Sequence, residues 1–149
     1  MYQEYEILTL GTELKKLLEK KSEPLMKKYD LRKIELDILA YLSSEACGDT
    51  AKEIMEKKHI SKAHVSKSID NLKQRGLITL NEDSKDHRYL HITLSAKANV
   101  VVAEFMAIHE ECRRIVFSML TKEEMEQISN ICKKMQENIR CEMTSTQKK

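Results

Sequence analysis

The stretch that decides the fold is Ser61–Leu77, SKAHVSKSIDNLKQRGL, followed at residues 78–94 by ITLNEDSKDHRYLHITL. Val65, Ile69 and Leu72 recur at helical spacing, which predicts a helix with one apolar face. Gly76 marks its end, since glycine commonly follows the last turn of a helix. The other face is polar and cationic and carries Ser61, Lys62, His64, Ser66, Lys67 and Asn71. Such a face suits the major groove of DNA, where cations contact phosphates and hydrogen-bonding side chains read base edges.

The residues just before this helix predict a shorter helix. Thr50-Ala-Lys-Glu53 is a capping box, in which the two end residues satisfy each other's free backbone amides. Ile54 and Met55 then face inward, and a brief turn at residues 59–60 leads to Ser61. Two short helices joined by a tight turn form a helix-turn-helix.

Positive charge is concentrated in this region. Residues 52–75 hold seven Lys/Arg against three Asp/Glu, a balance of +4, whereas the whole chain carries only +2. A basic helix face is also typical of a plain solvated surface, and some helix-turn-helix proteins bind no DNA. The segment beyond Gly76 is therefore needed to decide between DNA binding and a plain solvated surface.

Beyond Gly76 the apolar period changes from helical to alternating. Leu90, Ile92 and Leu94 share one face of a predicted strand at residues 89–94, and residues 77–80 form its expected partner. The polar loop between them carries Lys85, Asp86, His87 and Arg88. A helix-turn-helix followed by such a hairpin is a winged helix, and a cationic wing tip suits phosphate contact or insertion into a minor groove.

Long amphipathic helices are predicted on both sides of the winged helix. One runs from Tyr5 to about Lys21, and Pro24 begins or reshapes the next segment; a second helix spans residues 31–44. Ser95 caps a helix to about Met119, and a second capping box at Thr121 opens the last one, with residues 143–149 frayed. We expect one domain over residues 1–149: a mainly α fold with a winged helix-turn-helix at 31–95 and dimerisation helices at 1–30 and 96–143. A homodimer would cover their apolar stripes and place two recognition helices about one DNA turn apart, although one helical bundle is the alternative.

Composition supports a helical protein outside the membrane. With only 3 Gly and 1 Pro in 149 residues, a sandwich or barrel is disfavoured. No apolar run approaches the roughly 20 residues that span a bilayer, and the N-terminus lacks a secretory signal, so we expect a cytoplasmic protein. The four cysteines, at positions 47, 112, 132 and 141, form no C-x-x-C pair, and we expect reduced thiols that behave as small buried hydrophobes.

The segments TAKEIMEKKHISKAHVSKSIDNLKQRGLI and SKDHRYLHITLSAKA resemble the multiple antibiotic resistance regulator (MarR) family of bacterial transcription factors. The resemblance follows the helix order along nearly the whole chain and is closest from Thr50 to Ala98. Its most specific piece is the Asp-x-Arg of the wing, Asp86-His87-Arg88. The resemblance implies a homodimeric regulator, expected to be a repressor, that binds double-stranded DNA at a palindromic operator.

Carried over residue by residue, the resemblance makes Arg88 the arginine that enters the minor groove and Asp86 the residue that orients it. The base-facing positions of the recognition helix are Lys62, Ala63, His64 and Lys67, and the phosphate candidates are Ser61, Ser66, Lys73 and Lys85. Three positions depart from the family pattern. His87 stands where a second arginine is frequent, Ala98 where glycine is usual, and Arg32 with Glu35 where Thr and Gln are frequent.

The family resemblance also implies a small aromatic or phenolic effector in a cleft bounded by the first, second and fifth helices, whose binding releases DNA. Tyr5, Leu31, Met106 and His109 are the candidate pocket residues. No cofactor is required on this interpretation. A zinc site at His109 and Cys112, three apart on one helical face, is an alternative, as is redox sensing through a cysteine.

An enzyme is not indicated, since the chain has no glycine-rich phosphate loop, nucleophile elbow or recognisable pair of catalytic carboxylates. The rival from another functional class is a winged helix that binds a protein partner. It predicts no salt-dependent affinity for DNA and no effect of replacing Arg88.

Overall fold

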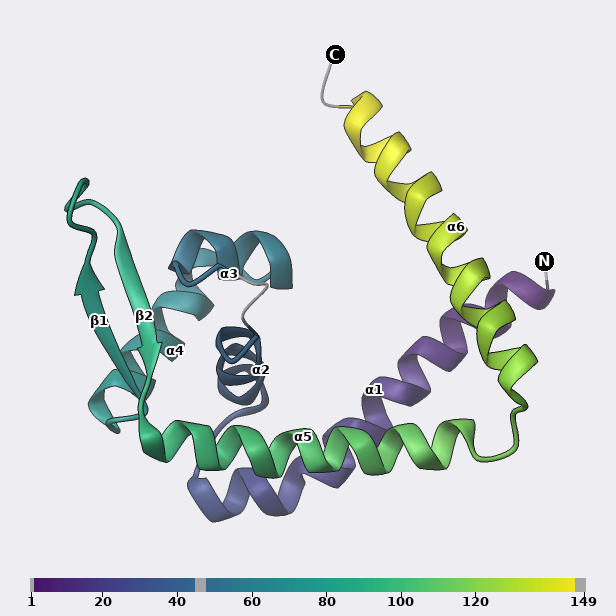
Figure 1. Cartoon of the computed structure of the whole chain (residues 1–149), viewed down its shortest axis with the longest axis horizontal. Helices are drawn as coiled ribbons and strands as arrows, with labels where there is room; N and C mark the ends of the chain where they lie inside the picture. Colours follow the sequence, from purple (N-terminus) through teal and green to yellow (C-terminus); the bar gives the residue numbers. More distant parts are fainter. Residues whose placement is uncertain (1, 45–47, 147–149) are drawn as a thin grey trace. The chain divides into compact units, whose positions relative to one another are not determined.

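The structure is a computed structural model that describes residues 2–44 and 48–146. Its elements follow the order α1 (Tyr2–Tyr29), α2 (Lys33–Leu42), α3 (Ala51–Lys58), α4 (Lys62–Gln74), β1 (Ile78–Glu82), β2 (Leu90–Leu94), α5 (Ala96–Phe117) and α6 (Lys122–Thr146) (Figure 1). The chain divides into two compact units, Met1–Cys112 and Arg113–Lys149. The predicted mainly α fold with one β-hairpin is confirmed; the assignment of all residues to one domain stays a prediction.

One apolar core lies inside the first unit and holds the winged helix together. The helix-turn-helix, the hairpin, the end of α1 and the first half of α5 all contribute to it, with Leu36, Ile38, Leu39, Ile54, Leu72, Leu77, Ile78, Val101 and Phe105 at 2% exposure or less. Each such side chain contributes on the order of 1.5–3 kcal/mol by leaving water. Ala98, at a position where the family resemblance predicts glycine, is fully buried in this core.

The hairpin has the register that the alternating pattern requires. Strands β1 and β2 pair antiparallel, with Ile78 opposite Leu94 and Leu80 opposite Ile92. Ile78 and Ile92 are buried, so the inner face of the wing closes the core, whereas Leu90 at its far end is 43% exposed.

Helix α1 differs from the prediction, because it runs through Pro24 to Tyr29 rather than ending near Lys21. A proline inside a helix removes one backbone hydrogen bond. Burial of Leu25 and two ion pairs to α5, Lys21–Glu111 and Lys28–Glu104, both at 2.9 Å, hold the helix across that position. Asp30 ends it in the left-handed conformation, at φ 51°.

Helix α6 extends beyond the prediction to Thr146, so residues 143–146 are helical rather than frayed. The expectation of buried cysteines is also wrong for two of them. Cys112 is buried, but Cys132 and Cys141 are exposed on α6. Among the described side chains of α6, only Met125 is partly buried in the single chain. Cys47 lies outside the described residues. No helix among residues 2–44 and 48–146 is long and apolar enough to cross a membrane.

Candidate nucleic-acid interface

The turn between α3 and α4 is built by local hydrogen bonds that the sequence predicts. Thr50 caps α3: its hydroxyl accepts the Glu53 backbone N–H at 3.3 Å, and the Glu53 carboxylate accepts the Thr50 N–H at 3.0 Å. His59 adopts a left-handed conformation at φ 53° and reverses the chain after α3. These contacts confirm the predicted helix-turn-helix.

Helix α4 separates its apolar and polar residues as predicted. Val65, Ile69 and Leu72 are buried, and Gly76 ends the helix at φ 68°. Seven residues predicted to face DNA from this helix are exposed: Ser61, Lys62, Ala63, His64, Ser66, Lys67 and Lys73. Asn71, also placed on the polar face, is only partly exposed and donates to Glu35 instead. The face is therefore open to a partner and carries three lysines and no carboxylate at those positions.

Ser61 and His64 form a small unit at the N-terminus of α4. The Ser61 hydroxyl accepts the His64 backbone N–H at 3.4 Å and lies 2.8 Å from Nδ1 of the His64 ring. Ser61 is therefore the N-cap of the recognition helix as well as a phosphate candidate. The same contact holds the His64 imidazole at the end of the helix that enters the groove in helix-turn-helix proteins.

At the wing tip, Asp86 holds Arg88. The guanidinium Nε and Nη2 donate to the two oxygens of the Asp86 carboxylate at 3.0 and 2.8 Å, and the Arg88 backbone N–H donates to the same carboxylate at 3.1 Å. The guanidinium lowers the pKa of Asp86. The Arg88 side chain is nonetheless 87% exposed, so it is oriented and still available to a ligand.

The other two wing candidates are exposed, and one of them has an acidic partner. Nδ1 of His87 lies 3.0 Å from the Glu82 carboxylate, which competes with phosphate for this ring. Lys85 is exposed, and its backbone N–H donates to Asp83 at 2.8 Å. Lys85 and Arg88 are thus the two exposed side chains of the polar loop that carry a permanent positive charge at neutral pH.

The pattern of the sequence did not identify the role of His91. Its Nδ1 lies 2.7 Å from the Asp49 carboxylate and its Nε2 lies 2.8 Å from the Asp83 carboxylate. The Asp49 and Asp83 carboxylates raise the pKa of His91 to about 8. Hydrogen bonds from His91 and from the backbone N–H groups of Asp86 and Lys85 lower the pKa of Asp83 to about 2. The alternating pattern along β2 placed His91 on the polar face of the strand, but no neighbouring residue in the sequence indicated that Asp49 and Asp83 are its partners.

A second polar cluster, also missed, fixes α4 on the rest of the unit. Glu35 on α2 is 2% exposed and accepts the Arg32 backbone N–H at 2.9 Å, the Arg32 guanidinium at 3.1 Å and the Asn71 amide at 3.1 Å. Burial would raise the pKa of Glu35, but these hydrogen bonds outweigh it and lower the pKa overall. Arg75, at the end of α4, donates to the backbone carbonyls of Tyr29 and Asp30.

The four predicted pocket residues differ in their environments, and their joint role stays a prediction. Tyr5 and Met106 are 74% and 50% exposed, whereas Leu31 is buried in the core. His109 packs edge-on against Phe105, with ring centroids 4.6 Å apart. A hollow of about 380 Å³ does lie between α1 and α5, lined by Lys21, Pro24, Leu25, Lys28, Glu104, Ala107 and Ile108, and none of the four lines it.

The two residues considered for a metal site, His109 and Cys112, both lie on the sheltered side of α5. Burial lowers the pKa of His109, and Cys112 is buried beside it on α5. Glu104 and Glu111, two carboxylates of the same helix, form ion pairs with lysines of α1. Within the described residues, no group of three or more His, Cys, Asp or Glu side chains is arranged to hold a metal ion.

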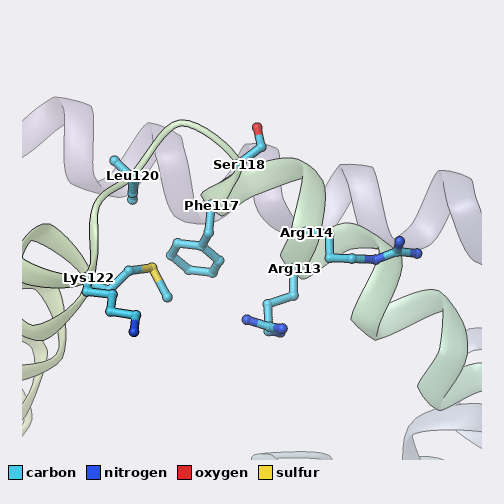
Figure 2. A pocket seen from close by; sticks show the side chains of 7 residues that line it. Arg113, Arg114, Phe117, Ser118, Leu120 and Lys122 are labelled. Atoms are coloured by element: carbon cyan, nitrogen blue, oxygen red, sulfur yellow. The ribbon is translucent and has the colours of Figure 1, made fainter.

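The second unit, by itself, has a hollow of about 270 Å³ at the turn between α5 and α6. Figure 2 shows the ring of Phe117 beside this turn with the side chains that share the hollow. It is lined by Arg113, Arg114, Phe117, Ser118, Leu120, Lys122 and Met125. None of the residues predicted from the sequence to bind DNA, an effector or a metal lies here.

Residues 29–88, which carry the helix-turn-helix and the wing arginine, match the MarR family model. The repressor MdtR of Bacillus subtilis is 27% identical over 110 residues, which cover 74% of this chain and 70% of MdtR. The MepR protein of S. aureus, solved in complex with DNA, is 25% identical, with a TM-score of 0.72 over 91% of this chain and 96% of MepR. A MarR protein of Peptoclostridium difficile is 22% identical and has the same fold, with a TM-score of 0.78 over 91% of this chain and 88% of that protein. Residues 29–88 thus match the MarR family, and over most of its length the chain has the winged-helix fold of solved MarR proteins and of the DNA-bound MepR.

Proposed function

We propose that the chain is a homodimeric repressor that binds a near-palindromic operator in double-stranded DNA and leaves it when a small molecule binds. The observation that carries the proposal is the pairing of Asp86 with an exposed Arg88 in a chain that also has an exposed cationic face on α4. MdtR is named a repressor, and MepR was solved with DNA. The α4 face supplies base and phosphate contacts in the major groove, and Arg88 supplies the minor-groove contact.

A homodimer is supported by apolar residues that one chain leaves in water. The first half of α1 exposes Tyr5, Ile7, Leu8, Leu10 and Leu14, and α6 exposes Ile128, Ile131, Met135, Ile139 and Met143. Soluble monomers rarely expose apolar stripes of this length. A second copy of the chain covers them in a symmetric interface and thereby provides two recognition helices for an inverted repeat.

A small aromatic or phenolic effector fits the hollow between α1 and α5. Its volume, about 380 Å³, lies in the range of small-molecule sites, and its lining combines apolar side chains with lysines. The Tyr29 hydroxyl donates to Glu104 at this hollow at 2.7 Å, and the Tyr29 carbonyl accepts from Arg75 at the end of α4. A ligand that displaces Glu104 from Tyr29 therefore acts on the contact that holds the recognition helix.

Selection of bound fragments from randomised duplex DNA at near-physiological salt tests the proposal. Enrichment of an inverted repeat with half-sites about one DNA turn apart is the expected result. The enriched duplex then serves as the probe for effectors. The Tyr29→Phe variant tests whether Tyr29 links the effector site to the recognition helix. This variant should bind DNA like the parent and respond less to the effector. Weak binding without sequence preference would overturn the operator proposal and favour a protein partner for the winged helix.

A further inference from the structure

The imidazole of His91 is held from both sides by acceptors. Each ring nitrogen lies within 2.8 Å of a carboxylate oxygen, Asp49 on one side and Asp83 on the other. Ionised carboxylates accept hydrogen bonds and cannot donate them, so both ring nitrogens have to donate. Only the imidazolium form carries two N–H groups. The geometry therefore selects the charged ring, and a neutral ring loses one of the two contacts.

The two carboxylates come from different parts of the winged helix. Asp49 immediately precedes Thr50, the cap of α3, and its backbone carbonyl accepts the Ile92 N–H of β2 at 2.8 Å. Asp83 directly follows β1, at the start of the wing loop. We call Asp49, His91 and Asp83 the wing clamp, because the ring of His91 joins the start of the helix-turn-helix to the loop that carries Arg88.

The clamp continues to Arg88 through hydrogen bonds. One oxygen of Asp83 binds His91, and the other accepts the backbone N–H groups of Lys85 and Asp86 at 2.8 and 3.0 Å. Asp86 in turn holds the Arg88 guanidinium at 2.8 Å. Loss of the contact between His91 and Asp83 removes one of the hydrogen bonds that fix the Asp83 carboxylate and so weakens the constraint on the turn that aims Arg88.

We propose that His91 is a positioning residue for the wing, whose charged ring holds Arg88 in the orientation that binds DNA. The inference rests on the proposed DNA-binding function and adds to it a residue outside the α4 face and the Asp86–Arg88 pair. It also predicts that affinity for DNA falls as His91 loses its proton, in addition to any effect of the histidines that face DNA.

The surroundings favour the charged ring at neutral pH. A hollow of about 390 Å³ beside the clamp is lined by Asp83, Tyr89 and His91 from the wing and by Thr50, Lys52, Glu53 and Glu56 from the segment at α3. The Asp49 and Asp83 carboxylates favour protonation of His91, and partial burial opposes it. Lys52 and Glu56 line the same hollow with opposite charges, and Glu53 is engaged in the cap of α3. The net effect raises the pKa of His91 to about 8, so the clamp is closed at pH 7 and opens as the pH rises through about 8.

Two variants of the full chain separate charge from structure. His91→Gln removes the charge and replaces two ring N–H groups by an amide whose donors sit on one nitrogen only, whereas His91→Arg keeps a permanent cation with several donors. The operator duplex obtained by selection serves as the DNA probe, and affinity is measured at about pH 6.5 and about pH 9. The other histidines are the same in all three proteins, so their contribution cancels in the comparison.

The parent should lose at least about fivefold more affinity than His91→Arg between the two pH values, the low end of typical couplings between sites. His91→Gln should bind weakly at both. NMR in the absence of DNA gives an independent readout. In the parent, the amide chemical shifts of Lys85, Asp86 and Arg88 should change with pH together with those of the His91 ring. In His91→Gln these amide shifts should show no such change.

Parallel pH profiles in the three proteins, or wing amides that ignore the titration of His91, would overturn the proposal. If the wing amides follow His91 but the parent binds no duplex at either pH, the proposed function fails while the clamp itself stands. The two failures are thus distinguishable.

Discussion

Arg88 and Asp86 form a two-pronged ion pair at an otherwise open wing tip, with Nε–Oδ1 at 3.0 Å and Nη2–Oδ2 at 2.8 Å. The pair restricts a long, flexible side chain without removing it from solvent. An arginine oriented in advance loses less conformational entropy when it enters a groove. The pair therefore prepares the wing for binding rather than stabilising the fold, since exposed ion pairs add little stability.

Replacing Arg88 tests the wing directly. Arg88→Ala should weaken binding to the selected operator roughly ten- to a hundredfold, because it removes a groove contact. Asp86→Asn keeps the arginine but loses its partner and should have a smaller effect of the same sign. Fluorescence anisotropy with a labelled duplex measures both. Unchanged affinity in Arg88→Ala would exclude the wing from the interface and favour a protein partner.

The lysines of the interface should determine its salt dependence. Lys85→Ala should reduce the slope of log affinity against log salt by about one, since one phosphate contact is lost. Lys20, exposed on α1 and remote in sequence from the winged helix, provides the matched control, and Lys20→Ala should leave the slope unchanged. Equal salt slopes in the parent, Lys85→Ala and Lys20→Ala would show that Lys85 does not contact a phosphate.

Gly76 should be required for its backbone conformation and not for lack of space. Its φ is 68°, and a β-carbon built there meets no atom within 4 Å. Gly76→Ala should therefore lower the free energy of unfolding by roughly 1–2 kcal/mol. Gly76→Asn should cost less, because asparagine tolerates the left-handed region. Urea denaturation at pH 7 compares them, and equal losses in the two variants would contradict the conformational explanation.

Glu35 should make stability depend on pH on the acidic side. Its pKa is lowered in the folded chain, so the ionised carboxylate stabilises the fold above its usual pKa near 4.5, and this contribution is lost as the pH falls through the lower folded value. Glu35→Gln should destabilise the protein at pH 7. The difference from the parent should shrink below about pH 4, which urea denaturation at both pH values measures. A difference that is independent of pH would show that packing, and not charge, is what Glu35 contributes.

The dimer should depend on the apolar stripes of α1 and α6. Leu8 and Ile139 are 71% and 60% exposed in the single chain, so a charge at either position costs the monomer little and disrupts a covered interface. Leu8→Asp and Ile139→Asp should shift the mass measured by light scattering from dimer to monomer while the helical circular dichroism persists. Glu13→Gln, at an exposed site on α1, is the control and should stay dimeric. If Leu8→Asp and Ile139→Asp remain dimeric, the dimer interface does not include these two positions.

Local sequence is sufficient to predict the order of elements, the two capping boxes, the ends of α4 and the wing arginine with its aspartate. Each of these features depends on residues within a few positions of one another, where backbone geometry and short side chains leave few alternatives. Asp86 and Arg88 are two residues apart, so their contact could be predicted once the loop was recognised.

Which distant polar groups meet depends instead on tertiary packing. His91 and Asp49 are 42 residues apart, and Glu35 and Asn71 are 36 apart, so their contacts exist only after the core has brought α2, α4 and the wing together. Helix α1 likewise continues through Pro24 because burial of Leu25 and ion pairs to α5 outweigh a local helix-breaking preference. Local rules fix the conformation of a segment, whereas the partner of a buried or shared charge depends on where every other segment packs.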